Sequence, residues 1–251
     1  MRLPTSSRMF GTALEPFARG AYRAGLRAFP ILYPAERRRF FKDDQMTVAV
    51  ARAELRPHSG FIDAGANAGV ILRSLVKCAP QGHQFAFEPI PYLAQTLRRK
   101  YPSVQVHQLA LSDFEGDAEF RFVRSRPALS SLRMSGDVEI ASDDQLIQVK
   151  VRRLDDVISA DIPIHFLKLD VEGAEAAMLR GAERTLRVHR PVVVFESGAT
   201  RLEDVLAALR PAQMRVASLD DDAARSSPNE ADLLRLAEQR GDYMFVARPA
   251  D

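Results

Sequence analysis

The chain has 251 residues, of which 46% are hydrophobic and 27% charged, the balance of a folded globular protein and not of a disordered or fibrous one. Cys78 is the single cysteine, which excludes an intrachain disulfide and indicates a reducing compartment, so we expect a cytoplasmic protein. No apolar run reaches the roughly 18–20 residues of a membrane helix, and we expect neither a transmembrane segment nor a secretory signal.

Residues 1–57 are predicted to form a basic helical arm. Residues 10–30 carry apolar side chains at helical spacing, interrupted by prolines, and residues 43–56 predict a second helix. Lys and Arg outnumber Asp and Glu here, although the formal net charge of the whole chain is only +2. Such an arm either packs as a solvated helix, which we favour because its basic and apolar residues are interleaved, or docks on an anionic partner. A Pro- and Gly-containing break at 57–60 then places the main domain at residues 58–251.

The main domain begins with strands and helices in alternation. Strands are predicted at residues 61–63, 83–88 and 104–111, and helices at 68–78 and 92–100. Strands separated by helices of this length usually pair in parallel through right-handed crossovers. This part of the chain therefore predicts a parallel sheet.

The middle of the chain breaks the alternation. Residues 118–123 and 146–152 alternate apolar and polar side chains, as antiparallel strands with one wet face do, and they predict an inserted β-hairpin. The polar segment 124–145 between them is longer than packing requires, which favours a lid or binding loop.

The strand–helix alternation then resumes. Strands are predicted at residues 164–169, 191–195, 214–218 and 243–247, and helices at 173–188, 202–209 and 229–239. The last two strands are predicted to be antiparallel. The fold class is therefore α/β, with a mostly parallel sheet of seven core strands and helices on both faces.

The segment FIDAGANAGV places an acid, Asp63, and two glycines, Gly65 and Gly69, between the first strand and its helix. Glycines there let a ligand and the helix approach the backbone closely, and the helix N-terminus offers free N–H groups. A dinucleotide site expects G-x-G-x-x-G, whose second glycine is missing here, so a pyrophosphate is poorly served. S-adenosylmethionine (SAM) has no phosphate, and an acid beside a glycine turn suits its amino acid end. The loop therefore favours SAM over a dinucleotide.

Further acids follow the predicted strands: Glu88, Asp113 and Asp170. Ligands of open α/β sheets bind beyond the carboxyl ends of the strands, so we expect these side chains to converge. A carboxylate at Glu88 can accept both ribose hydroxyls, and Asp113 could meet the adenine amino group. Each acid alone also fits a helix cap or strand end, and for Asp113 that interpretation is as strong as the functional one.

Three acids are candidates for the base that takes a proton from a hydroxyl acceptor: Asp170, Glu172 and Glu196, in that order of preference. Acids close to one another can have pKa values raised into a useful range. Glu172 also fits a structural role in the first turn of a helix. The histidines have no metal-ligand spacing, and we expect no metal.

A series of motifs occurs in order along residues 59–197: FIDAGANAGV, AFEPIP, LALSDFEGDAEF, SSL, LDD, IHFLKLDVEGAEAAMLRGAE and PVVVFE. In their order and spacing they resemble the FkbM family of SAM-dependent methyltransferases. The resemblance implies a Rossmann-like seven-stranded fold and O-methyl transfer, often to a sugar or natural-product hydroxyl. It also implies a loop that folds over the site, which contains SSL, and site residues at matching positions. Asp63, Gly65, Asn67 and Gly69 would line the cofactor loop, Glu88 would hold the ribose, Asp113 would lie on the adenine side, and Asp170, Glu172 and Gly173 would border the transferred methyl.

The leading hypothesis is thus a SAM-dependent O-methyltransferase that acts on a small hydroxylated acceptor, a saccharide or secondary metabolite, with no nucleic-acid partner. The alternative is a non-enzymatic Rossmann-like module whose basic arm docks on RNA, an acidic partner or a membrane face. A nicotinamide oxidoreductase is a weaker third interpretation because of the missing loop glycine.

Overall fold

The computed structural model describes residue 25 and residues 34–124, 127–132, 144–220, 229–240 and 243–250. The chain divides into two compact units, Met1–Met46 and Thr47–Asp251. Helix α2 (Ala35–Glu54) crosses this division and contains most of the helix predicted at 43–56. The helical pattern predicted at 10–30 lies almost entirely outside the described residues, so the basic arm stays a prediction. No helix in the described ranges is long and apolar enough to cross a membrane.

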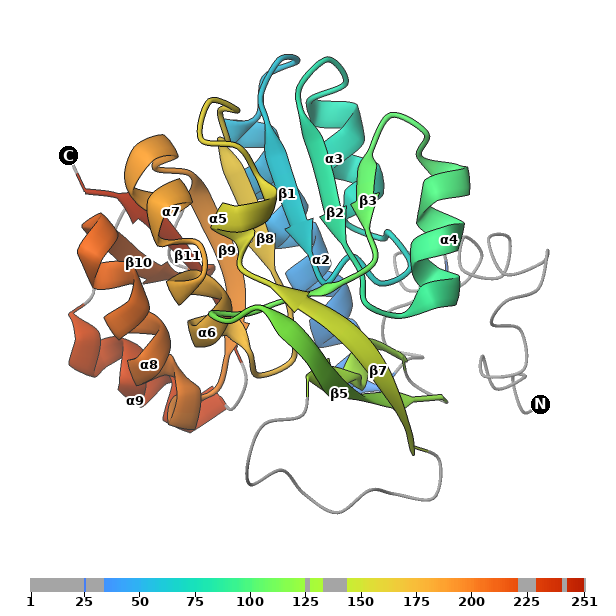
Figure 1. Ribbon diagram of the computed structural model, residues 1–251. Coiled ribbons are helices and arrows are strands. Elements are labelled where there is room, and N and C mark those ends of the chain that lie inside the picture. The colour runs from blue at the N-terminus through green and yellow to red at the C-terminus, as the bar shows by residue number, and fades with distance from the viewer. Residues whose placement is uncertain are drawn as a thin grey trace. The chain divides into compact units, whose positions relative to one another are not determined.

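The second unit is built on a seven-stranded sheet with the order β10-β11-β9-β8-β1-β2-β3. Its strands are β1 (Phe61–Ala64), β2 (Gln84–Phe87), β3 (Gln105–His107), β8 (Phe166–Leu169), β9 (Val192–Ser197), β10 (Met214–Ser218) and β11 (Tyr243–Pro249). The first five pair in parallel, whereas β11 runs antiparallel to both β9 and β10. The predicted α/β class, the seven strands and the antiparallel end are confirmed (Figure 1).

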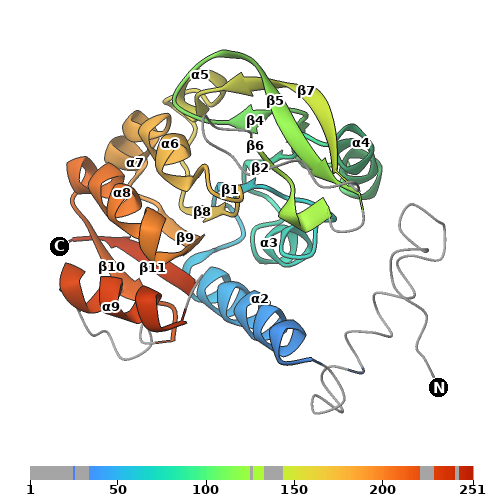
Figure 2. The same ribbon diagram turned by 90° about the horizontal axis from the view of Figure 1, so that it is seen from below.

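The hydrophobic core of the second unit forms because alternate side chains of the buried strands lie on the same face of the sheet. One face of the sheet presents Ile62, Phe87, Leu167 and Phe195 to the helices that follow β8 and β9. These are α6 (Glu175–Arg180), α7 (Glu183–His189) and α8 (Ala199–Leu209), and α9 (Glu230–Arg240) contributes to the same cluster. Helix α3 (Leu72–Cys78) lies on the other face (Figure 2). Helices on both faces are what a buried parallel sheet requires.

A second sheet of four strands, in the order β4-β7-β5-β6, lies beyond the carboxyl ends of β1 and β2 (Figure 1). The predicted hairpin is confirmed as β5 (Gly116–Val123) paired antiparallel with β7 (Asp144–Arg152). The strands β4 (Ala110–Leu111) and β6 (Ser131–Leu132) complete it. The strand predicted at 104–111 is therefore wrong as one element, because its first part stays in the main sheet as β3 and its last part pairs with β7.

Two predicted helices need correction. The helix predicted at 68–78 begins only at Leu72, and residues 68–71 form turns. The helix predicted at 173–188 is divided into α6 and α7. The Gly181 carbonyl accepts a hydrogen bond from the Asp155 amide instead of continuing the helix, and the Asp155 carboxylate accepts from the Thr185 amide. These tertiary hydrogen bonds replace helical ones, which no local pattern reveals. The helix α4 (Pro91–Lys100) agrees with its predicted range.

Candidate active site

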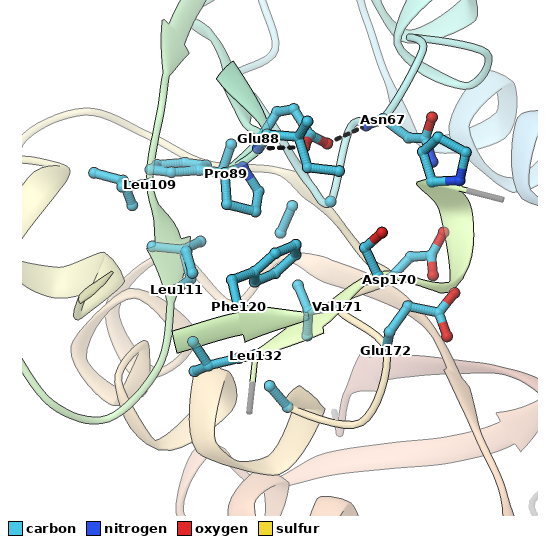
Figure 3. Close-up of a pocket in the computed structure, with 18 of the residues that line it drawn as sticks. Asn67, Glu88, Pro89, Leu109, Leu111, Phe120, Leu132, Asp170, Val171 and Glu172 are labelled. Atoms are coloured by element: carbon cyan, nitrogen blue, oxygen red, sulfur yellow. Dashed lines mark hydrogen bonds between the residues drawn. The ribbon is translucent and has the colours of Figure 1, made fainter. Parts of the chain in front are cut away.

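A cleft opens at the carboxyl ends of β1, β2 and β8 and encloses about 570 Å³, including space open to solvent. One wall comes from these strand ends and the loops after them, and the opposite wall comes from the second sheet. The side chains divide by polarity, with Asn67, Asp170 and Glu172 at one end and apolar residues at the other (Figure 3). The lining includes Gly65, Asn67, Glu88, Leu111, Phe120, Leu132, Asp170 and Glu172.

The loop after β1 is held by hydrogen bonds from its own backbone. The amides of Gly65 and Ala66 both donate to the Phe87 carbonyl at 3.0 Å, and the Asn67 amide donates to Glu88 Oε2 at 2.7 Å. Gly65 and Asn67 line the cleft, as predicted for a cofactor loop, whereas Gly69 does not. The carbonyl of Gly69 accepts from the Tyr101 hydroxyl instead. The loop is therefore tied by the chain's own groups to the end of β2 and to Tyr101, the C-cap residue of α4.

Gly65 and Gly69 are required by close contacts within the chain. A Cβ on Gly65 would lie 1.7 Å from the Asp170 carbonyl oxygen, and one on Gly69 would lie 2.7 Å from Leu97 Cδ2 and 2.9 Å from Tyr101 Cε2. Both residues have positive φ, 74° and 72°. The chain itself therefore approaches both glycines closely, and the approach of a ligand to the loop stays a prediction.

Glu88 lies at the end of β2, is 3% exposed, and faces the cleft. Its two carboxylate oxygens accept from the Asn67 and Ile90 amides at 2.7 and 2.8 Å (Figure 3). Burial raises the pKa of Glu88 to about 7, although the two amides oppose this shift. Each carboxylate oxygen has a second lone pair, so Glu88 can fix the loop and still accept hydrogen bonds from a ligand.

Asp63 does not line the cleft, although the sequence places it in the glycine loop. Its side chain is fully buried on one face of the sheet, with Oδ1 3.4 Å from the Nζ of Lys168, its register partner on β8. Burial raises the pKa of Asp63, and the Lys168 ammonium opposes that shift. Sequence reasoning missed Lys168, whose signal is a lone charge inside the apolar strand FLKL.

Asp170 and Glu172 follow β8 and both line the cleft. The carboxylate of Asp170 forms a 3.1 Å ion pair with Lys168 Nζ. Burial raises the pKa of Glu172 to about 9, and the negative charges of Asp170, Glu196 and Glu175 add to this effect. A carboxyl group that holds its proton near neutral pH can exchange protons with a ligand.

Glu196 lies on β9, close enough to Glu172 to raise its pKa, but it does not line the cleft. Sequence reasoning missed two residues that act on Glu172. Glu175 is 3% exposed and accepts from the Gly173 amide at 3.0 Å, and Arg201 on α8 lowers the pKa values of Glu172 and Glu175. Glu175 can be found in the DVEGAE motif, whereas Arg201 stands in an ordinary amphipathic helix. The predicted catalytic acids therefore lie in one acidic region.

Asp113 lies away from the cleft lining. It follows β4 of the second sheet and not a strand of the main sheet, which corrects its predicted placement at a third convergent strand end. Its carboxylate forms a 2.8 Å ion pair with Arg180. Strand ends of the main sheet bring acids together at Asp63, Glu88 and Asp170, and the role of Asp113 near an adenine stays a prediction.

The apolar wall of the cleft comes largely from the second sheet. Phe120 on β5 and Leu132 on β6 lie 5% exposed in a small core of their own. Pro127, Ala128 and Ser130 of the long loop line the cleft as well. The part of the predicted lid within 127–132 thus borders the site, and residues 133–143 lie outside the described residues.

The described part of the chain holds no group of three or more His, Cys, Asp or Glu side chains arranged for a metal ion.

Comparison with known proteins agrees with this geometry. Residues 63–221 match the family model of the methyltransferase FkbM domain. The chain is 31% identical over 150 residues to Methyltransferase 1 of Beauveria bassiana (strain ARSEF 2860), covering 51% of this chain and 60% of that protein. It is 26% identical over 163 residues to Methyltransferase sdnD of Sordaria araneosa, covering 52% and 63%. The chain thus spans less than two thirds of either relative.

A crystal structure of methyltransferase FkbM from Methylobacillus flagellatus KT shares the fold, with a TM-score of 0.50 and 20% identity over 77% of this chain and 44% of that one. The family match covers more than half of the chain and includes the loop after β1, the ends of β2 and β8, and the second sheet. The chain therefore belongs to the FkbM family of methyltransferases.

Proposed function

We propose that this domain transfers a methyl group from SAM to a hydroxyl of a small acceptor, a saccharide or a secondary metabolite. The observation that carries the proposal is the cleft itself, in which Glu88 stands between the loop after β1 and an apolar wall, opposite two further carboxylates.

The lining groups suit the parts of SAM. The buried Glu88 carboxylate can accept ribose hydroxyls with its remaining lone pairs. Phe120, Leu111 and Leu132 offer apolar surface to an adenine ring. The acidic side chains of Asp170 and Glu172 favour the cationic groups of SAM, its α-ammonium and its sulfonium.

SAM supplies a methyl group already activated on a sulfonium, so the protein mainly has to align two reactants, which can contribute about 7–11 kcal/mol. Among the chain's own residues, we assign the proton acceptor to Glu172. It lines the cleft, and burial together with the neighbouring negative charges raises its pKa to about 9. A positively charged ligand in the cleft lowers this pKa towards neutral, so that Glu172 releases its proton to solvent and can then accept the proton of the acceptor hydroxyl. Asp170 lines the cleft as well, but its ion pair with Lys168 favours a positioning role.

Calorimetry with SAM and S-adenosylhomocysteine (SAH) tests the cofactor. We expect both to bind the folded protein, and NADH to show no heat of binding. A folded chain that binds neither sulfur ligand contradicts the proposal. A screen of hydroxylated sugars and secondary metabolites against labelled SAM, with matched amines as controls, then tests the acceptor class, and transfer only to amines contradicts the O-methyl assignment.

Replacing Glu88 by alanine is expected to weaken SAH binding by about 1–3 kcal/mol, because a ligand hydroxyl loses a charged acceptor and the Asn67 amide loses its partner. Calorimetry measures the change. The control is Glu238→Ala on the exposed side of α9, which should bind SAH as the wild type does. Equal affinity of both variants would refute the ribose assignment.

A further inference from the structure

Lys168 is a lysine in the interior of a sheet. It lies in the middle of β8, is 6% exposed, and extends towards the end of the neighbouring strand β1. Its Nζ donates to the Gly65 carbonyl at 2.8 Å and lies 3.4 Å from the Ala64 carbonyl. The same ammonium is 3.1 Å from Asp170 Oδ2 and 3.4 Å from Asp63 Oδ1.

A lysine in such a place is costly unless its charge is paired, because burial penalises the ammonium. The carboxylates of Asp63 and Asp170 outweigh that penalty and raise the pKa of Lys168 above its ordinary value, so the side chain stays a cation. A buried ion pair of this kind is rarely the most stable arrangement for a core, since apolar side chains of the same volume often serve as well. A function beyond packing therefore has to be considered.

The contacts of Lys168 divide into two sets. Asp63 is fully buried and does not line the cleft, so that ion pair concerns only the interior. Gly65 and Asp170 both line the cleft, one from β1 and the other from β8. One ammonium thus joins the two backbone segments that border the polar end of the cleft, and it does so from behind, since Lys168 itself is not part of the lining.

We propose that Lys168 is a positioning residue for the cofactor site: its ammonium holds the Gly65 carbonyl and the Asp170 carboxylate in one arrangement and so sets the glycine loop before a ligand arrives. The opposite side of the loop is already tied by the amides of Gly65, Ala66 and Asn67 to the end of β2. Lys168 ties the loop to β8 through its hydrogen bond to the Gly65 carbonyl. That this ligand is SAM rests on the proposed function, whereas the positioning of the glycine loop by Lys168 does not depend on it.

The competing explanation is that Lys168 only compensates the charge of Asp63. Lys168→Met alone cannot separate the two, because it leaves Asp63 buried without a counter-charge and weakens the whole fold. Asp63→Asn combined with Lys168→Met removes both charges. The double variant should regain much of the lost stability, yet the Gly65 carbonyl and Asp170 still lack their shared donor.

The experiment compares the wild-type chain, Asp63→Asn, Lys168→Met and the double variant, with Lys150→Met on the exposed side of β7 as the matched control. Hydrogen exchange of the amides of residues 65–67 reports the loop without any ligand, and exchange in β11 reports the core. SAH binding is measured by calorimetry.

We expect loop exchange in the double variant to be about tenfold or more faster than in Asp63→Asn with β11 unchanged, and SAH to bind about 10- to 100-fold more weakly, the loss that a charged hydrogen bond implies. Loop exchange and SAH affinity equal to those of Asp63→Asn would overturn the proposal and leave charge compensation as the role of Lys168. If the wild type itself binds no SAH, the proposed function is wrong, and the exchange comparison still decides the role of Lys168.

Discussion

Replacing Gly65 by alanine is expected to abolish SAH binding and to lower the free energy of unfolding by about 2–4 kcal/mol. The residue has φ of 74°, and the new Cβ would lie 1.7 Å from the Asp170 carbonyl oxygen. That oxygen belongs to backbone at the end of β8, so it cannot turn away as a flexible side chain would. The loop after β1 and the segment after β8 have to separate, and both line the cleft. Urea unfolding and calorimetry measure the two effects.

The matched control is Gly116→Ala at the start of β5. Gly116 also has positive φ, 156°, but a Cβ there meets no atom within 4 Å among the described residues. It therefore measures the conformational cost alone, which we expect to be about 1–3 kcal/mol and smaller than the loss at Gly65, with SAH binding retained. Equal losses of stability in the two variants would show that close contact with Asp170 is not what makes Gly65 necessary.

Replacing Glu172 by glutamine is expected to make the protein more stable above neutral pH. The pKa of Glu172 is about 9 in the folded protein against an ordinary value of 4.5, so the folded state holds this proton more tightly than the unfolded state does. The free energy of unfolding of the wild type therefore falls as pH rises from about 4.5 towards 9. Glutamine has no proton to lose, and the variant should exceed the wild type at pH 8 by about 1–3 kcal/mol, a discounted figure because Glu172 is partly exposed.

The same variant tests the catalytic assignment. If Glu172 accepts the proton of the acceptor, Glu172→Gln should lower kcat by about 10²–10⁴-fold while the protein becomes more stable. Urea unfolding at pH 5 and pH 8, with methyl transfer under the same conditions, measures both, and Glu203→Gln on the exposed side of α8 is the control. A stability difference that does not grow from pH 5 to pH 8 would mean that Glu172 ionises as an ordinary carboxylate. An unchanged kcat would mean that Glu172 is not the proton acceptor and that another acid of the cleft has this role.

The effects of Glu172→Gln on stability and on kcat both follow from the charged groups around Glu172. Glu172 stands among Asp170, Glu175 and Glu196, with Arg201 as the cation that lowers its pKa. Such an arrangement costs stability in the free protein and favours a positively charged ligand. Stability lost to a strained or charged site is a common cost of activity.

The chemistry at the strand ends could be predicted from local patterns. Short buried runs followed by Asp63, Glu88 and Asp170 identify strands that end at one edge of a parallel sheet, and such an edge gathers its side chains. The structure does bring Glu88, Asp170 and the loop around Gly65 to one cleft. The same rule predicts a wrong place for Asp113, because the segment LALSD looks like the end of a third parallel strand of the main sheet. Ala110 and Leu111 instead pair with β7, far along the chain.

The sequence by itself determined the α/β class, the seven strands, the inserted hairpin and the family resemblance, because periodicity and short motifs are local properties of the chain. Only the tertiary structure decided that Lys168 stands between Asp63 and Asp170, that Asp170 is what crowds Gly65, and that the second sheet closes the cleft with Phe120 and Leu132. These contacts join residues from strands far apart in the chain. Their distances follow from sheet register and from the packing of the second sheet, and neither is encoded in any single segment.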